Sequence, residues 1–295
     1  NICKCGAKRK DLQLGLEPTF NEYIIKLCDI FDEVKRVLRD DGTCWVNIGD
    51  SYMGSGKAGN NPDYQKKHTS FGNVMKKGSY GVPTKIKGMS AKCLAMIPMR
   101  FAIEMVNRGW ILRNTIIWHK PNCMPSSVKD RFTIDFEYIF FFSKKKKYYF
   151  EQQLEPSQYK DSKGNVSDKA RLQRANAGWK PGKDYPVQAN VPQAIDNVGD
   201  RYCPAMRNKR AVWKIKPKPF KEAHFAVYPE ELCETPIKAG CSKGGIVLDP
   251  FFGSGTTGLV ALKQEKKFIG CELNPEYIKI AEARLKPFMV QERLI

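Results

Sequence analysis

The sequence lacks two features that would place it at a membrane. No apolar run approaches the length of a bilayer span, and the chain does not open with a signal-peptide pattern. We therefore expect a cytoplasmic protein with no membrane partner.

The sequence also offers little to hold a metal ion. Most of its 10 cysteines are single residues within apolar runs, which is typical of reduced core cysteines in a cytosolic protein. Cys3 and Cys5 are the one closely spaced pair, and a zinc site needs about four ligands. We therefore expect no metal. The cysteines within apolar runs are Cys28, Cys44, Cys93 and Cys271.

Acidic residues are too few to balance the basic ones. The chain has 50 Lys and Arg against 31 Asp and Glu, a formal net charge of +19. Residues 53–92 hold 8 Lys and 1 Asp, and residues 151–220 hold 14 basic and 7 acidic residues, whereas residues 221–295 carry 10 of each. The excess is therefore concentrated outside the C-terminal part and favours a nucleic-acid partner.

The clearest motif is the segment from Asp249 to Gly258, which reads DPFFGSGTTG. The apolar run 245–248 before it predicts a buried parallel strand, and residues 257–263 after it have the composition of a helix. A second apolar strand, 268–271, ends at Glu272. This unit is typical of nucleoside-cofactor sites, because glycines let the backbone approach the ligand and a carboxylate at the strand end can accept bonds from both ribose hydroxyls.

Two other kinds of nucleotide loop share features with this segment. The absence of lysine from this loop argues against a Walker phosphate loop, which needs Gly-Lys-Ser/Thr. Gly253, Gly255 and Gly258 have the G-x-G-x-x-G spacing of dinucleotide sites. The spacing alone therefore leaves NAD and other adenosine cofactors open.

The Asp-Pro-Phe lead-in followed by GSGTT resembles the cofactor motif of the DNA amino-methyltransferases, which holds S-adenosylmethionine. Other segments resemble the same family, and together they cover most of the chain outside 53–92 and 151–220. The cofactor motif lies near the C-terminus, an order similar to the permuted beta class. The further segments are NIGDSY (47–52), WHKPN (118–122), KDR (129–131), FEYIFFF (136–142) and HFAVYPEEL (224–232).

The resemblance implies an α/β fold: a Rossmann-like S-adenosylmethionine-dependent methyltransferase sheet in permuted order, with an inserted target-recognition region. Residues 1–150 would form the catalytic-side half, with 53–90 as a mobile basic loop. Residues 151–220 would form the target-recognition region and 221–295 the cofactor-binding half. In the middle region basic residues are interleaved with aromatics, a composition that suits phosphate contact and base stacking. These aromatics are Trp179, Tyr185, Tyr202 and Trp213, and for Trp213 we prefer a core position.

The family's catalytic motif is not visible. The beta class carries Asp/Ser-Pro-Pro-Tyr ahead of its first long helix, and this sequence contains no Pro-Pro pair. We expect that motif to lie N-terminal to Asn1, so the catalytic residues are unassigned. The alternative is a degenerate motif at Asp50, Ser51 and Tyr52, but it lacks the prolines and follows the helix.

The resemblance also assigns residues to the cofactor. Asp249 would lie near the methionine amino group, Phe251 would pack on the cofactor, and the segment with Phe225 would close over the methionine end. Gly253 and Gly255 would give backbone access, Thr256 and Thr257 would donate to the carboxylate, and Glu272 would take the ribose.

Basic residues near the expected cleft are candidates for DNA contact. Lys120, Lys129 and Arg131 flank a loop after an expected strand, next to His119, which we interpret as structural. The remaining candidates for DNA contact are Lys144, Lys145, Arg207, Lys209 and Arg210.

Periodicity predicts the main elements. Thr19 and Glu22 form a capping box for a helix ending at Gly42. A strand at 43–48 follows, and then a helix at 94–107 with Pro98 in its first turn and Gly109 after it. The expected strands at 110–118 and 136–142 are antiparallel neighbours at one sheet edge, and a last helix spans 276–285.

The function implied is transfer of a methyl group from S-adenosylmethionine to an exocyclic amine of a flipped base, with N4 of cytosine favoured over N6 of adenine. The alternatives are a cofactor- and DNA-binding protein without catalysis, and an RNA methyltransferase. The expected partners are double-stranded DNA, a cognate restriction endonuclease and a second copy of the chain.

Overall fold

The computed structural model describes residues 14, 15, 17, 19–53, 89–156, 206–218 and 228–289. The chain divides into two compact units, one formed by residues 1–151 with 211–295 and the other by residues 152–210. The expected mobile loop at 53–90 and most of the expected target-recognition region lie outside the described residues. Both remain predictions.

The first helix, α1, runs from Phe20 to Val37 and begins as its capping box predicts. Thr19 Oγ1 accepts a hydrogen bond from Glu22 N at 3.2 Å and donates to the Glu22 carboxylate at 3.3 Å. The predicted end at Gly42 was wrong: Leu38 already has an extended backbone, and Gly42 N bonds to Arg39 O in the turn that follows.

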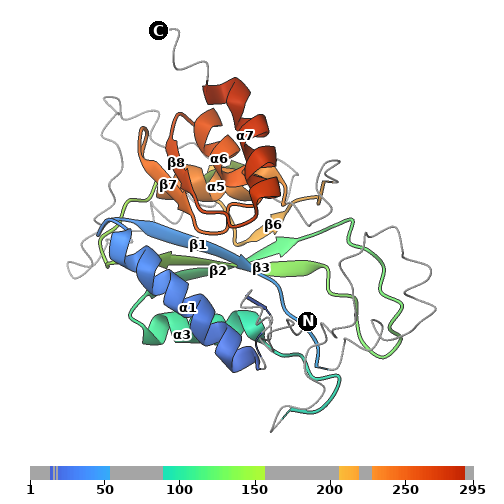
Figure 1. Ribbon diagram of the computed structural model, residues 1–295. Helices are drawn as coiled ribbons and strands as arrows, with labels where there is room; N and C mark the ends of the chain where they lie inside the picture. Colours follow the sequence, from blue (N-terminus) through green and yellow to red (C-terminus); the bar gives the residue numbers. More distant parts are fainter. Residues whose placement is uncertain are drawn as a thin grey trace, which may run out of the picture. The chain divides into compact units, whose positions relative to one another are not determined.

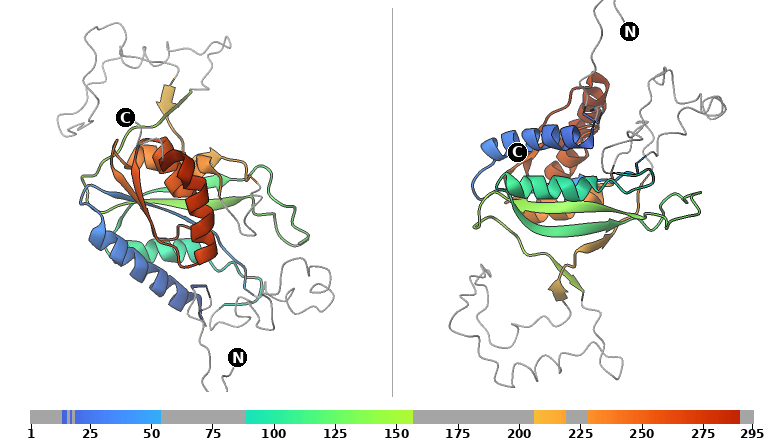
Figure 2. Two further views of the ribbon diagram at one scale, coloured as in Figure 1. Left: turned by 45° about the horizontal axis from the view of Figure 1, so that its top comes forward. Right: turned by 90° about the horizontal axis from the view of Figure 1, so that it is seen from below.

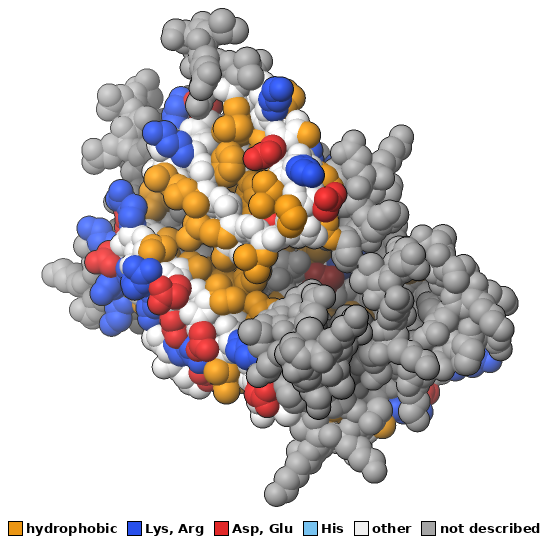
Figure 3. Space-filling model, viewed as in Figure 1, with side chains coloured by type: hydrophobic (Ala, Val, Ile, Leu, Met, Phe, Trp, Pro, Cys, Tyr) orange, Lys and Arg blue, Asp and Glu red, His pale blue; other side chains and the backbone are white. Residues whose placement is uncertain are grey.

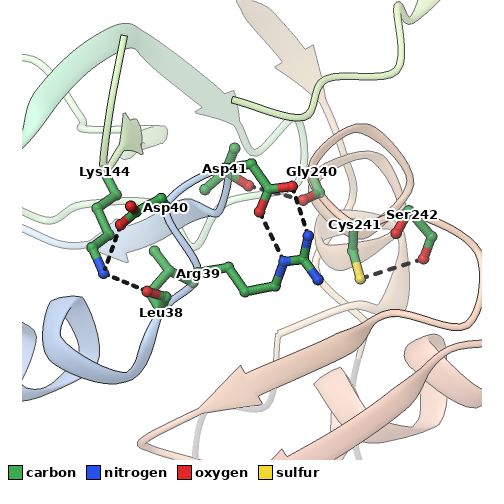
Figure 4. A network of polar contacts seen from close by, with 9 residues as sticks. Leu38, Arg39, Asp40, Asp41, Lys144, Gly240, Cys241 and Ser242 are labelled. Atoms are coloured by element: carbon green, nitrogen blue, oxygen red, sulfur yellow. Dashed lines mark hydrogen bonds and ion pairs between the residues drawn. The ribbon is translucent and has the colours of Figure 1, made fainter. Parts of the chain in front are cut away.

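The connection from α1 to the first strand is held by the polar network in Figure 4. The Arg39 guanidinium donates to both carboxylate oxygens of Asp41, at 2.9 and 3.0 Å. Lys144 Nζ donates to Leu38 O at 2.5 Å and lies 3.4 Å from Asp40. Lys144 therefore satisfies a carbonyl at the end of α1, where a positive charge also complements the helix dipole.

Four strands form the larger sheet, in the order β1-β3-β2-β6 (Figure 1). They are β1 (Thr43–Ile48), β2 (Ile111–His119), β3 (Phe136–Ser143) and β6 (Val212–Lys214). The antiparallel pairing of β2 with β3 is confirmed, but their predicted place at the sheet edge was wrong, because β1 and β6 flank them. Their position depends on the pairing of β3 with β1 and of β2 with β6, which the pattern of each segment does not show.

Both faces of this sheet are apolar. Helices α1 and α3 (Ile97–Asn107) cover one face (Figures 1 and 2), and Phe140 and Phe142 of β3 point into that core. Ile139 and Phe141 alternate with them and pack on the other side with Trp213, so the expected core position of Trp213 is confirmed.

Helix α3 begins three residues after the predicted Leu94. Leu94 pairs with Tyr52 in an antiparallel bridge, and Ala95 N donates to Ser51 O at 2.8 Å. Met96 then takes a left-handed conformation, so the helix starts at Ile97 with Pro98 in its first turn. The end at Asn107, followed by Gly109 with a φ of +80°, is as predicted.

The C-terminal part forms a smaller α/β layer of two parallel strands and three helices. β7 (Ile246–Asp249) pairs with β8 (Lys267–Gly270), and α6 (Thr256–Lys263) joins them. Helices α5 (Glu230–Gly240) and α7 (Pro275–Met289) complete the layer, and α7 is longer than predicted. The α/β, Rossmann-like fold class is confirmed.

Helix α5 fixes the direction of the strands around it. Thr43 Oγ1, at the start of β1, donates to Gly240 O at the end of α5. Tyr228, just before α5, contacts Asp249 at the end of β7. Leu232, near the start of α5, belongs to the same apolar cluster as Ile139, which pairs with Asn47 near the end of β1. Strands β1 and β7 therefore both run antiparallel to α5, and their carboxyl ends lie on the same side.

Within the described residues, β1 pairs only with β3 and β7 pairs only with β8, so each has one side without a neighbouring strand. Figure 3 shows apolar side chains gathered over the region of β7, β8 and α1. Exposed apolar residues of these elements include Ile25, Ile246 and Ile269.

In the described residues of the second unit, β4 (Leu154–Pro156) pairs antiparallel with β5 (Met206–Asn208). Lys209 N donates to Gln153 O at 2.9 Å. No helix in the described part of the chain is long and apolar enough to cross a membrane.

Candidate functional site

The loop between β7 and α6 owes its shape to its glycines. Gly253 and Gly255 have φ angles of +51° and +80°, in the left-handed region that favours glycine. A Cβ at Gly253 would meet nothing closer than 4.0 Å, so the space beside it is open. This open cradle is where a ligand could approach the backbone.

A different constraint applies to Gly258 and Gly270. A Cβ on either would overlap the Phe252 ring, at 2.6 Å for Gly258 and 2.3 Å for Gly270. The buried Phe252 ring stacks on Phe268 with 5.4 Å between centroids. Gly258, the third glycine of the G-x-G-x-x-G pattern, therefore leaves space for the buried Phe252 ring, which packs the loop against Phe268.

Asp249 ends β7, and both of its carboxylate oxygens are engaged. Oδ1 accepts from Phe251 N at 2.9 Å, and Oδ2 accepts from Thr257 Oγ1 at 2.6 Å. The Tyr228 hydroxyl lies 2.6 Å from Thr257 Oγ1 and 3.4 Å from Asp249 Oδ2. Since Thr257 gives its single proton to Asp249, Tyr228 is the donor to Thr257.

This network changes the role expected for Thr257. A hydroxyl has one proton, so Thr257 cannot donate to a ligand carboxylate while it donates to Asp249. Burial, with smaller contributions from the charges of Cys233 and Asp249, raises the pKa of Tyr228 well above its ordinary value. Tyr228 therefore stays protonated and remains a donor in this network.

Thr256 is held by a residue that the sequence did not point out. Arg284 of α7 reaches back to the loop, and its Nη1 lies 2.7 Å from Ser254 O, 2.9 Å from Ser254 Oγ and 3.2 Å from Thr256 Oγ1. Arg284 follows the buried Ala281 by three residues, on the packing face of the predicted helix. The three-residue spacing from Ala281 is the sequence feature that could have placed Arg284 on the face of the helix that packs against the loop.

Glu272 lies just after β8, as predicted, and binds the loop directly. Its Oε2 accepts from Gly253 N and its Oε1 from Asn274 N, each at 2.8 Å. Each carboxylate oxygen has two acceptor positions, so one remains free of these backbone bonds on each. Two free acceptor positions at a strand end match the two hydroxyls of a ribose.

Phe251 is the exposed aromatic of the loop, with 47% of its surface accessible. One side of its ring meets Phe31 of α1 at a centroid distance of 6.4 Å. The remaining exposed surface is available to a ligand. Phe225 lies outside the described residues.

The alternative catalytic motif has a structural role in this fold. Asp50 Oδ1 accepts from Ser51 N at 2.8 Å and from Ile97 N at 3.0 Å, so it caps α3 from outside that helix. Tyr52 lies beneath Arg131, whose guanidinium carbon is 3.5 Å from the ring centroid. Both residues follow the carboxyl end of β1.

The basic residues proposed for DNA contact lie at different places. Lys120 pairs with Glu137 and its Nζ lies 4.2 Å from the Trp118 ring centroid, while Lys129 is exposed. Lys144 and Lys145 follow the other end of β3, about 25 Å away for a strand of this length. These two lysines therefore do not share one edge of the sheet with Lys120.

The remaining candidates belong to the second unit or lie outside what is described. Arg210 Nε donates to Glu155 at 2.7 Å, and Lys209 is exposed. The side chain of Arg207 is not among those described, nor are Trp179, Tyr185 and Tyr202. His119 Nε2 lies 3.3 Å from an Asp135 oxygen, at the closure of the loop after β2, where a structural histidine was expected.

No cluster of three His, Cys, Asp or Glu suited to a metal ion occurs in the described ranges. Cys3 and Cys5 lie outside these ranges.

The chain is similar to known proteins over almost its whole length. The model of a DNA methylase family matches residues 6–283. The type II methyltransferase M.SmaI of Serratia marcescens is 39% identical over 273 residues, which are 92% of this chain and 77% of that protein. M.Cfr9I of Citrobacter freundii is 38% identical over 94% of this chain and 75% of its own length.

Solved structures share the fold. The PvuII DNA methyltransferase, described as cytosine-N4-specific, aligns with a TM-score of 0.56 at 19% identity over 94% of this chain and 75% of that chain. The protein TTHA0409 from Thermus thermophilus, in complex with S-adenosyl-L-methionine, aligns with a TM-score of 0.53 at 19% identity. This alignment covers 95% of the present chain and 83% of that chain.

Proposed function

The chain belongs to the DNA methylase family, and we propose that it transfers a methyl group from S-adenosylmethionine to an exocyclic amine of a base in double-stranded DNA. N4 of cytosine is the favoured target, on the resemblance of the segments that flank the cofactor motif, and N6 of adenine is the alternative. The single observation that carries the proposal is the pairing of Glu272 with Gly253, which places two free carboxylate acceptor positions beside an open glycine cradle.

The residues of the glycine loop fit this cofactor. Glu272 would accept hydrogen bonds from the ribose hydroxyls, and Phe251 would pack its exposed surface on the ligand. Gly253 leaves open the space that a side chain would fill. Asp249 holds the loop through its bonds with Phe251 N and Thr257 Oγ1, and its Oδ1 keeps one acceptor position that would serve the methionine amino group.

When bound, S-adenosylmethionine supplies an electrophilic methyl group on a sulfonium. The protein then has to bring the amine nitrogen into line with that methyl, so catalysis is mainly positioning and electrostatics. The base must leave the duplex, because the amine is inaccessible within the stack. No acceptor for the amine protons is assigned among the described residues, and the alternative candidate, Asp50, binds Ser51 N and Ile97 N through its Oδ1.

On the DNA side, Lys129 and Arg131 lie in the loop that follows the carboxyl end of β2. We propose that they contact the phosphate backbone at the edge where the cofactor binds. A restriction endonuclease with the same recognition sequence is the expected functional partner, and a homodimer is the proposed assembly.

The direct test is transfer of labelled methyl from S-adenosylmethionine to mixed-sequence duplex DNA, followed by nucleoside mass spectrometry. A 4-methylcytosine or 6-methyladenine signal would support the enzyme and identify the base. Structured RNA, assayed in parallel, tests the RNA alternative. Absence of product on either nucleic acid, with cofactor binding intact, would favour a binding protein without catalysis.

A further inference from the structure

The loop between β2 and β3, residues 120–135, exposes more apolar surface than its function as a connection requires. In Figures 1 and 2 this segment extends beyond the ends of both strands. Large exposed apolar side chains grouped in one segment are typical of a binding surface. They are Met124 at 88% exposure, Val128 at 39%, Phe132 at 96% and Ile134 at 42%.

This loop is held at its base and near its outer part. Lys120 N donates to Asp135 O at 2.6 Å across the base. Asp130 forms an ion pair of 2.6 Å with Lys92, and the Arg131 guanidinium lies over Tyr52. The Phe132 side chain next to Arg131 is 96% exposed, so it makes little contact with the body of the protein.

The position of this loop relates it to the cofactor site. It follows the carboxyl end of β2, and β2 runs in the same direction as β1 because both are antiparallel to β3. The contacts of Gly240, at the end of α5, with Thr43, and of Tyr228, just before α5, with Asp249 place the carboxyl ends of β1 and β7 on one side of the sheets. A base that reaches the glycine loop therefore approaches at the edge from which Phe132 projects.

The charge next to Phe132 suits a duplex. Lys129 and Arg131 are basic, and the carboxylate of Asp130 between them is paired with Lys92. Asp135, the other acid of the loop, lies beside His119. Basic side chains beside an exposed aromatic can contact phosphates while the aromatic enters the base stack.

We propose that Phe132 enters the DNA base stack and fills the gap that the target base leaves when it moves into the site. This inference rests on the proposed function, since it needs a duplex from which one base is extruded. It goes beyond the phosphate contacts of Lys129 and Arg131 by naming the side chain that compensates for lost stacking.

The test compares the binding of the full chain to two short mixed-sequence duplexes by fluorescence anisotropy. One duplex is intact, and the other carries an abasic site that provides a ready gap. The wild-type protein should bind the abasic duplex at least about fivefold more tightly, because unstacking has already occurred. Phe132→Ala should reduce this preference to about one, and Phe132→Trp should retain it.

Met124→Ala is the matched control, because Met124 is almost as exposed in the same loop. It should keep the preference, and all three variants should keep the wild-type affinity for S-adenosylmethionine. An unchanged preference in Phe132→Ala, or no preference in the wild type, would overturn the proposal. So would a Phe132→Ala variant that binds both duplexes normally but loses self-association by light scattering, since the surface would then bind protein.

Methyl transfer by the wild type is measured separately. A lack of methylated nucleoside with the abasic preference intact would count against the proposed function alone. Product formation with an unchanged preference in Phe132→Ala would count against the role of Phe132 alone.

Discussion

Thr257 Oγ1 donates a hydrogen bond of 2.6 Å to Asp249 Oδ2, and this bond joins the first turn of α6 to the end of β7 across the glycine loop. Tyr228, which lies outside the motif, donates in turn to Thr257: its hydroxyl is 2.6 Å from Thr257 Oγ1. The conformation of the loop therefore depends on a hydroxyl that the family resemblance assigned to the ligand.

Removing that hydroxyl should weaken cofactor binding indirectly. We expect Thr257→Val to lower the affinity for S-adenosylmethionine by roughly tenfold, because a partly buried carboxylate loses a donor worth about 1–3 kcal/mol. Thr257→Ser, which keeps the hydroxyl, should stay close to wild type, and Tyr228→Phe should fall between them. Isothermal titration calorimetry checks this order, and equal affinities for the valine and serine variants would contradict it.

Glu272→Ala should weaken cofactor binding more than tenfold. The substitution removes the acceptor for Gly253 N and both acceptor positions proposed for the ribose. Glu282→Gln, on the exposed side of α7, is the control and should leave the dissociation constant unchanged. Unchanged binding in Glu272→Ala would show that the pocket lies elsewhere.

Arg284→Met should raise the dissociation constant for the cofactor by about three- to tenfold, because the loop carbonyl of Ser254 loses a charged donor. Arg284→Lys should recover part of the loss, since an ammonium can replace some of these bonds. The measurement is cofactor titration together with thermal unfolding. A fall in stability with unchanged affinity would limit Arg284 to a structural role.

Gly258→Ala and Gly270→Ala should each destabilise the protein by about 1–3 kcal/mol, because the added Cβ overlaps the buried Phe252 ring. Thermal unfolding would report this as a fall of several degrees in Tm. Gly49→Ala is the matched control, since its Cβ would meet only Glu137 at 3.8 Å. A control that loses as much stability would argue against the steric explanation.

Burial raises the pKa of the Cys44 and Cys233 thiols to about 12 from an ordinary value of 9.0. In the unfolded chain these thiols lose their protons at lower pH than in the fold. The free energy of unfolding should therefore fall as the pH rises from about 9 toward 12.

At neutral pH, iodoacetamide should label the exposed Cys93 and Cys271 well before Cys44, as followed by peptide mass spectrometry.

Local signals in the sequence predicted much of the fold. The capping box at Thr19, the strand at 43–48 and the glycine unit after Asp249 each depend on neighbours within a few residues. The predicted helix end at Gly42 was wrong, because a glycine signals a stop but the extended backbone of Leu38 ends the helix earlier. The late start of α3 depends on pairing between residues about 40 positions apart, which periodicity cannot show.

The sequence by itself determined the family motif, the acid after β8 and the glycines whose backbone conformations the loop requires. Only the tertiary structure decided which distant side chains hold that loop, because Tyr228 and Arg284 come from elements that meet Asp249 and Ser254 through packing. The tertiary structure also separated Lys144 from Lys120, because Lys120 lies beside the start of β3 and Lys144 follows its end, so the length of the strand lies between them.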